Sequence, residues 1–280
     1  MGTSYTHRLL AGHALFLSAS VPAEDREKKY RSIPDAFARI EEAVLRVAGA
    51  VFNAGGTLVF GGHPSISPLI GYLCAQYQQP TPAEGERRFQ GRSEGTGAGP
   101  RVEMWQSEAF RHTWAEPSER LAKMPGVAVT WTPAEAGERF DEALRGKPQC
   151  VESLLRMRTE LMKRAQPMAM IAIGGMEGVE EEVRLFRTIC PGRTVYALSS
   201  TGGAAKILVE ERQNDAGVKS YDDEVRGHVR EFRRRVRVQQ AETRKERGDV
   251  PPPGEEEEIT IPYANVASRI VADIVASLHE

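Results

Sequence analysis

The chain has 280 residues, with 37 Lys and Arg against 39 Asp and Glu, and a formal net charge of -2. No overall positive field therefore attracts it to nucleic acid, and no apolar run approaches the roughly 18 residues of a membrane span. Three widely spaced cysteines without a CxxC pair argue against a disulfide scaffold and a metal site. The N-terminal apolar stretch lacks a small-residue cleavage pattern. We therefore expect a cytoplasmic α/β protein without a membrane contact or a metal.

Short apolar runs alternate with helical patterns along most of the chain. Continuous apolar runs are typical of strands that are buried on both faces. Their alternation with helices indicates right-handed crossovers. The sequence thus predicts a Rossmann-like, mostly parallel sheet of about six or seven strands with helices on both faces. In chain order we expect a strand at 14–17, a helix at 34–52, and strands at 57–60, 102–105, 127–130, 168–173 and 194–198.

Two segments differ from this pattern. Residues 81–100 are polar and rich in Gly and Pro, which predicts a mobile loop at the ligand edge or a disordered insert. Residues 211–280 read as a helical C-terminal extension, with a helix at 222–245, a break at the PPPGEEEE segment and an amphipathic helix at 261–278 that docks on the body. We expect one domain over 1–280, with its core at about 12–210.

Glycines follow three of the expected strands. In open parallel sheets, ligands bind at the carboxyl ends of the strands, and glycine there lets backbone N–H groups approach an anion closely. Strand ends and tight turns use glycine as well, so each pair alone has that simpler explanation. The three corners are Gly61-Gly62, Gly174-Gly175 with Gly178, and Gly202-Gly203.

The segment IAIGGMEGVEEE is the most distinctive feature. A buried strand ends, a glycine turn follows, and a helix begins near Gly178. Three glutamates, Glu180 to Glu182, occupy the first turn of this helix, where the helix dipole favours carboxylates. One that faces inward could instead bind ribose hydroxyls or act as an acid or base.

The stretch RMRTELMKRAQPMAMIAIGGMEGVEEE resembles the central signature of the LOG family and of its wider SLOG superfamily. Arg158 precedes the strand at the family's spacing, and Gly174-Gly175, Gly178 and Glu182 match the glycines and the glutamate. LFLSASVP, VFGGHPSISPLIG and YALSSTGGAAKIL are similar to the first-strand, second-strand and late glycine motifs. The resemblance spans about residues 12–210.

LOG proteins are phosphoribohydrolases that release a base from a nucleoside monophosphate. The resemblance implies that Arg158 and Glu182 are catalytic. Glu182 would stabilise the charge on the ribose and orient water, and Arg158 would hold a phosphate or the ribosyl face. The N–H groups near Gly178 and Val179 would hold phosphate. An ion pair of Arg158 with Glu182 or Glu160 is the alternative. The resemblance also implies a homodimer and no cofactor.

The signature departs from the family pattern in the turn. Ile173 replaces a proline, Met176-Glu177 replaces a single residue, and Val179 replaces a threonine. Glu177 would repel a monophosphate. These changes indicate another nucleotide-derived ligand, such as a dinucleotide, a cyclic nucleotide or an ADP-ribose type of signal. A non-catalytic sensor in a bacterial nucleotide-signalling or antiviral defence system is therefore the alternative to a nucleotide N-glycosidase.

Hydroxyl and imidazole side chains at the strand ends are further candidate ligand contacts. Caps and turns would use the same residue types, Ser65 as a helix cap above all. The candidates are Ser18, Ser20, His63, Ser65, Ser200 and Thr201.

An arginine-rich stretch lies within the expected helix at 222–245. Spacings of three and four place four of its arginines on one helical face, which could bind polyanions. Because it carries a single aromatic residue and acidic residues close by in sequence, we favour a solvated or self-paired helix and expect no nucleic-acid partner. The arginines are Arg226, Arg230, Arg233, Arg234, Arg235 and Arg237.

Overall fold

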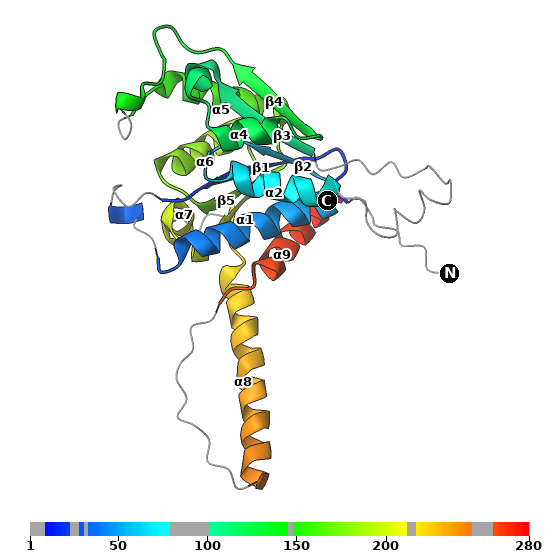
Figure 1. Cartoon of the computed structure of the whole chain (residues 1–280). Coiled ribbons are helices and arrows are strands. Elements are labelled where there is room, and N and C mark those ends of the chain that lie inside the picture. The colour runs from blue at the N-terminus through cyan, green and yellow to red at the C-terminus, as the bar shows by residue number, and fades with distance from the viewer. Residues whose placement is uncertain are drawn as a thin grey trace.

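The computed structural model of the protein describes residues 9–22, 28–30, 33–78, 101–144, 148–211, 217–247 and 260–279. Within these ranges the chain forms an all-parallel seven-stranded sheet between two layers of helices (Figure 1). The predicted Rossmann-like α/β fold is confirmed. The strands are β1 (Ala14–Ser20), β2 (Thr57–Phe60), β3 (Arg101–Ser107), β4 (Val127–Thr132), β5 (Ala169–Gly174), β6 (Val195–Leu198) and β7 (Val218–Lys219).

The order of strands across the sheet is β4-β3-β2-β1-β5-β6-β7. The chain builds outward from β1 to β4, then crosses to the other side of β1 and builds outward again from β5. The β1–β5 pair is therefore a topological switch point, where helices leave the sheet in opposite directions and a crevice opens. Ser20 and Gly174 are register partners at the carboxyl end of this pair.

Two helical layers cover the sheet because its strands are apolar on both faces. Along β5, Ile171 and Ile173 enter one apolar cluster, and Met170 and Ala172 enter the other. The first layer contains α1 (Ala36–Asn53), α2 (Ser67–Gln78), α4 (Glu116–Ala122) and α9 (Tyr263–Ala276). The second contains α5 (Val151–Ala165), α6 (Glu177–Ile189) and α7 (Gly203–Glu211). Short 3-10 turns complete the described chain: η1 (Lys28–Tyr30), η2 (Glu108–Thr113), η3 (Glu142–Leu144) and η4 (Ser199–Thr201).

The C-terminal region behaves as its hydrophobic pattern predicts. Helix α9 lies along α1 and buries Val266, Ile270 and Ile274 in the first cluster. Helix α8 (Asp222–Arg247) projects away from the body (Figure 1). The two-residue strand β7 was not expected, because so short a segment carries no periodicity. The predicted loop at 81–100 and the PPPGEEEE segment lie outside the described residues.

Side-chain chemistry agrees with two further expectations. All three cysteines are free and buried, and Cys190 packs in the second apolar cluster. On α8, Arg226 pairs with Asp223, and Arg234 and Arg235 pair with Glu231. The self-paired interpretation is confirmed for those three arginines. Across the ranges described, every helix is too short or too polar to cross a membrane.

Candidate functional site

A cavity of about 460 Å³ opens at the carboxyl ends of β1, β2 and β3, beside the start of α6. This volume lies in the range of small-molecule sites. Its position at the switch point is the one that the parallel sheet predicts. Of the residues predicted from sequence, those that line the cavity are Ser18, Ser20, Gly61, Gly62, His63, Arg158, Gly178, Val179 and Glu182.

The polar side of the cavity centres on Glu182. The Arg158 Nε donates to Glu182 Oε1 at 3.0 Å, and the Ser18 hydroxyl donates to Glu182 Oε2. The side chain of Arg158 is 13% exposed and that of Glu182 is 14% exposed, so this ion pair is largely removed from water. Three elements, β1, α5 and α6, thus fix one carboxylate at the cavity wall.

The second donor of Arg158 is also engaged. Its NH1 group donates to a carboxylate oxygen of Glu181. A Cβ added at Gly178 would lie 3.0 Å from Arg158 NH2, so the guanidinium lies directly against the first turn of α6. Of the predicted ion pairs, the one with Glu182 forms. Glu160 pairs with Arg156 and Arg164 instead.

The three consecutive glutamates of α6 have different partners. Glu180 accepts from the Tyr30 hydroxyl at 2.6 Å and from Lys29 Nζ at 3.1 Å. Burial raises the pKa of Tyr30 above its ordinary value, and the bond to Glu180 raises it further. Of these glutamates, Glu182 is the one that lines the cavity.

The glycine corner after β2 is built around close backbone packing. Gly62 has φ +61°, and an added Cβ would lie 2.3 Å from Gln106 Nε2. The same amide donates to Gly61 O at 2.9 Å and to Gly62 O at 3.2 Å. The His63 Nδ1 and the Ser65 hydroxyl are 2.8 Å apart. Helix α2 begins at Ser67, and the Ser65 hydroxyl bonds to the His63 ring. Among the described residues, Ser65 therefore does not cap this helix.

The turn after β5 uses several of its backbone donors within the protein. Gly174 N–H donates to Thr201 Oγ1 at 2.8 Å, and Gly175 N–H donates to Ser20 O at 2.8 Å. Val179 N–H donates to Met176 O at 2.9 Å. Three of the N–H groups in this predicted phosphate cradle are therefore already bonded.

The glycine corner after β6 packs against the β5 turn. Gly203 has φ +58°, and an added Cβ would lie 2.4 Å from Gly175 O. Ser200 N–H donates to buried Asp222 Oδ2 at 2.6 Å, and the Ser200 hydroxyl is 3.0 Å from the Tyr263 hydroxyl. Two glycine corners reach the cavity, and the third does not join them. Some of the residues predicted from sequence are not among the described residues that line the cavity. They are Ser65, Gly174, Gly175, Glu177, Ser200, Thr201, Gly202 and Gly203.

An aromatic wall of the cavity was not predicted from the sequence. Phe110, Trp114 and Phe140 line the cavity. The Phe110 and Phe140 rings are 5.2 Å apart with planes inclined at 33°, and the Trp114 and Trp131 rings are 4.9 Å apart and nearly perpendicular. Phe110 and Trp114 come from η2 and the residue directly after it, whereas Phe140 comes from a separate loop. No motif connects the two segments, so sequence spacing gives no signal for the wall as a whole. The one available clue is that Phe110 follows the carboxyl end of β3.

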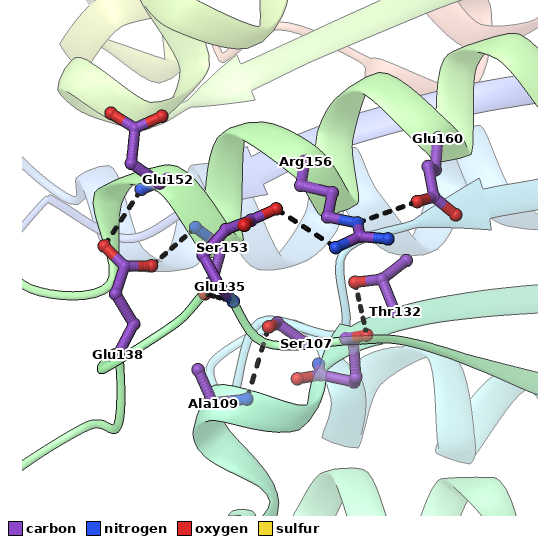
Figure 2. Close-up of polar contacts among 10 residues, drawn as sticks. Ser107, Ala109, Thr132, Glu135, Glu138, Glu152, Ser153, Arg156 and Glu160 are labelled. Atoms are coloured by element: carbon purple, nitrogen blue, oxygen red, sulfur yellow. Dashed lines mark hydrogen bonds and ion pairs between the residues drawn. The ribbon is translucent and has the colours of Figure 1, made fainter.

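The loop that carries Phe140 is attached to α5 by charged and polar contacts (Figure 2). Glu138 accepts from the backbone N–H groups of Glu152 and Ser153, at 3.1 and 2.6 Å, and so caps the helix that carries Arg158. Hydrogen bonds from Ser153 hold the pKa of Glu138 below its ordinary value. Arg156 bridges Glu135 to Glu160 across the same joint. One carboxylate thus fixes both the aromatic wall and the arginine helix.

The fold, the glycine corners and the Arg158–Glu182 pair define a Rossmann-like protein with a cavity at the carboxyl edge of its sheet. Comparison with known families makes the class specific. The chain belongs to the SLOG cluster3 family, whose sequence profile matches residues 92–236. Membership implies a nucleotide-derived ligand. The match contains Arg158, Glu182 and the aromatic wall. Across the described residues, no three His, Cys, Asp or Glu side chains form a group that could hold a metal ion.

Other comparisons add little to this assignment. The X-ray structure of TM1055, a structural genomics target, matches with a TM-score of 0.39 and 13% sequence identity, over 71% of this chain and 81% of that one. At this level the likeness extends to neither ligand nor activity. No curated protein matches the chain in sequence.

Proposed function

We propose that the cavity binds a nucleotide-derived ligand and that Glu182 assists hydrolysis of its N-glycosidic bond. The observation that supports this most is the carboxylate held by Arg158 and Ser18 at the cavity wall. A fixed carboxylate needs little reorganisation as charge develops, and this is what electrostatic stabilisation of a transition state requires.

The reaction assigns each group a role. As the bond from C1′ to the base nitrogen breaks, positive charge builds on the ribose and Glu182 stabilises it. A water oxygen bonds to C1′, Glu182 accepts the proton that this water loses, and the departing base takes a proton from solvent. Arg158 acts as a positioning residue, since its Nε and NH1 groups bond to Glu182 and Glu181.

A non-catalytic sensor is the second candidate. The observation in its favour is that the Glu182 oxygens and two of the Arg158 donors are engaged within the protein, which suits a rigid recognition surface as well as a reactive one. Helix α8, which projects from the body, would offer such a sensor a surface for an effector.

Incubation with nucleosides, nucleoside monophosphates, NAD and ADP-ribose separates the two candidates. Chromatography measures the released base, and thermal unfolding measures binding. For a hydrolase we expect base release that falls by at least about 100-fold in Glu182→Gln. The control is Glu160→Gln, a carboxylate on the exposed side of α5, which should keep full activity. Stabilisation without base release supports the sensor, and neither effect with any nucleotide would refute both.

A further inference from the structure

The aromatic side of the cavity has the shape and chemistry of a base subsite. Phe110 and Phe140 lie as a tilted pair, and Trp114 is held edge-on by Trp131. Phe60, Leu154 and Met157 extend this apolar lining. Flat aromatic surfaces of this kind stack on other π-systems, and a nucleobase is the flat part of a nucleotide.

The rings are held in place by backbone contacts. Phe140 N–H donates to Ala109 O at 3.0 Å, and Phe140 O lies 2.9 Å from His112 Nε2. The loop of Phe140 is tied to η2, which carries Phe110, and to α5 through Glu138. A stacking surface formed before the ligand arrives loses less conformational entropy on binding.

Among the described residues, those on the polar side of the cavity lack the excess positive charge that a phosphate needs. Arg158 contributes one positive charge, and Glu181 and Glu182 contribute two negative ones that contact it directly. Glu142 adds another carboxylate to the lining. A phosphate beside Arg158 would also lie next to the two carboxylates that already pair with the guanidinium, and their repulsion opposes its binding.

Several backbone donors near the cavity are engaged within the protein. The N–H groups of Gly174, Gly175 and Val179, at the turn expected to cradle phosphate, donate to Thr201, Ser20 and Met176. Neutral ribose hydroxyls, by contrast, can donate to the Glu182 carboxylate and exchange bonds with the Ser18 hydroxyl without a net charge.

We propose that this cavity takes the uncharged nucleoside portion of its ligand. The base lies on the Phe110–Phe140 and Trp114 wall, the ribose hydroxyls face Ser18 and Glu182, and any phosphate stays outside the Arg158 cluster. This inference rests on the proposed function, because it assigns an orientation to the same ligand. It predicts that a 5′-phosphate contributes nothing to binding.

The first test compares adenosine, guanosine, cytidine and uridine with their 5′-monophosphates, ribose 5-phosphate and inorganic phosphate by calorimetry on the full chain. We expect at least one nucleoside to bind as tightly as its monophosphate or more tightly. Ribose 5-phosphate and inorganic phosphate should neither bind nor compete. A monophosphate that binds about tenfold more tightly than its nucleoside overturns the inference and leaves the proposed function standing. If no compound with a base binds, the proposed function fails as well.

The second test restores positive charge to the cavity. Glu181→Gln removes a carboxylate that pairs with Arg158 NH1 but does not line the cavity. We expect the monophosphate to gain affinity several-fold while the nucleoside is unchanged. Glu160→Gln removes a charge of the same sign from α5, where it pairs with Arg156, and should change neither affinity. An unchanged ratio of affinities in Glu181→Gln contradicts the electrostatic argument.

The third test addresses the base subsite. Phe140→Ala should weaken nucleoside binding at least several-fold and leave its preference over the monophosphate as it was. Tyr72→Ala, an exposed aromatic on α2, is the control and should bind normally. Near-ultraviolet circular dichroism verifies that both variants remain folded. Full affinity in folded Phe140→Ala refutes stacking on this wall.

Discussion

At the scale of single residues, the Arg158–Glu182 pair shows how local sequence and three-dimensional position divide the information. The resemblance to SLOG sequences indicated both residues from their spacing around one strand. Their engagement with Ser18 and Glu181 depends on the packing of β1 and α5 against α6, because a side chain 164 residues away in sequence supplies one of the bonds. The spacing in the sequence predicted which two residues matter, and the tertiary packing determines which carboxylates balance the charge of Arg158.

Replacement of Arg158 by Met tests how much stability this pair provides. Because both side chains are largely buried, loss of one partner leaves an uncompensated carboxylate, and we expect the free energy of unfolding to fall by about 3 kcal/mol. The control is Arg156→Met, on the same helix but 38% exposed, which should cost less than about 1 kcal/mol. Urea denaturation measures both. Equal costs would mean that burial of the pair is energetically unimportant.

At the scale of elements, the glycine motifs have two different roles. Gly61, Gly62 and Gly178 contribute to the cavity, whereas Gly203 packs against the β5 turn and Gly202 packs against Ile33. The sequence could not distinguish these roles, because a glycine that admits a ligand and a glycine that admits another backbone have the same local signature.

Gly203→Ala tests the contact behind the β5 turn. The added Cβ would lie 2.4 Å from Gly175 O, and φ is positive, so we expect a loss of more than about 2 kcal/mol in the free energy of unfolding. Gly192→Ala has a similar φ of +79° but nothing within 4 Å, and should cost about 1 kcal/mol from strain alone. Thermal and urea unfolding of both variants give the comparison. If Gly203→Ala lowers the free energy of unfolding no more than Gly192→Ala does, the β5 turn must shift to accommodate the added Cβ.

Asp222 fixes the first turn of α8 to the body and makes stability depend on pH. Its Oδ2 accepts from Ser200 N–H, and its Oδ1 is buried without a partner among the described residues. Burial raises the pKa of the Asp222 carboxyl above its ordinary value of 3.8. The contribution of this carboxyl to the free energy of unfolding is therefore complete below pH 3.8 and is lost as the pH rises through the raised pKa. Relative to Asp222→Asn, the wild type should therefore lose stability as the pH rises from about 4.

Urea denaturation of both proteins across that range measures this dependence. Asp223→Asn serves as the control. The Asp223 side chain is 80% exposed, and its ion pair with Arg226 contributes little to stability. If the difference between wild type and Asp222→Asn stays constant with pH, the carboxyl does not titrate as its burial requires.

At the scale of the whole molecule, the C-terminal helix is part of the core and not an appendage. Ile270→Ala should lower the free energy of unfolding by about 3 kcal/mol, because this side chain is 2% exposed within the cluster around α1. Ser268→Ala, on the exposed face of α9, should have little effect. Denaturant titration distinguishes the two. A small effect of Ile270→Ala would mean that α9 is docked only loosely.

The single-domain organisation and the homodimer that the resemblance implied stay predictions. Cooperative unfolding detected by two spectroscopic probes would support one domain. Sedimentation at several concentrations would establish the oligomeric state.

Taken by itself, the sequence determined six of the seven strands in chain order, the sheet edge at which the cavity opens and the family resemblance. These features follow from local periodicity, strand-end glycines and one motif, all of which are properties of neighbouring residues. The tertiary structure alone decided which glycine corners reach the cavity, how the charge of Arg158 is balanced and that aromatic side chains line the same cavity as Glu182. Those properties arise between segments far apart in the chain, where the pattern of neighbouring residues carries no information.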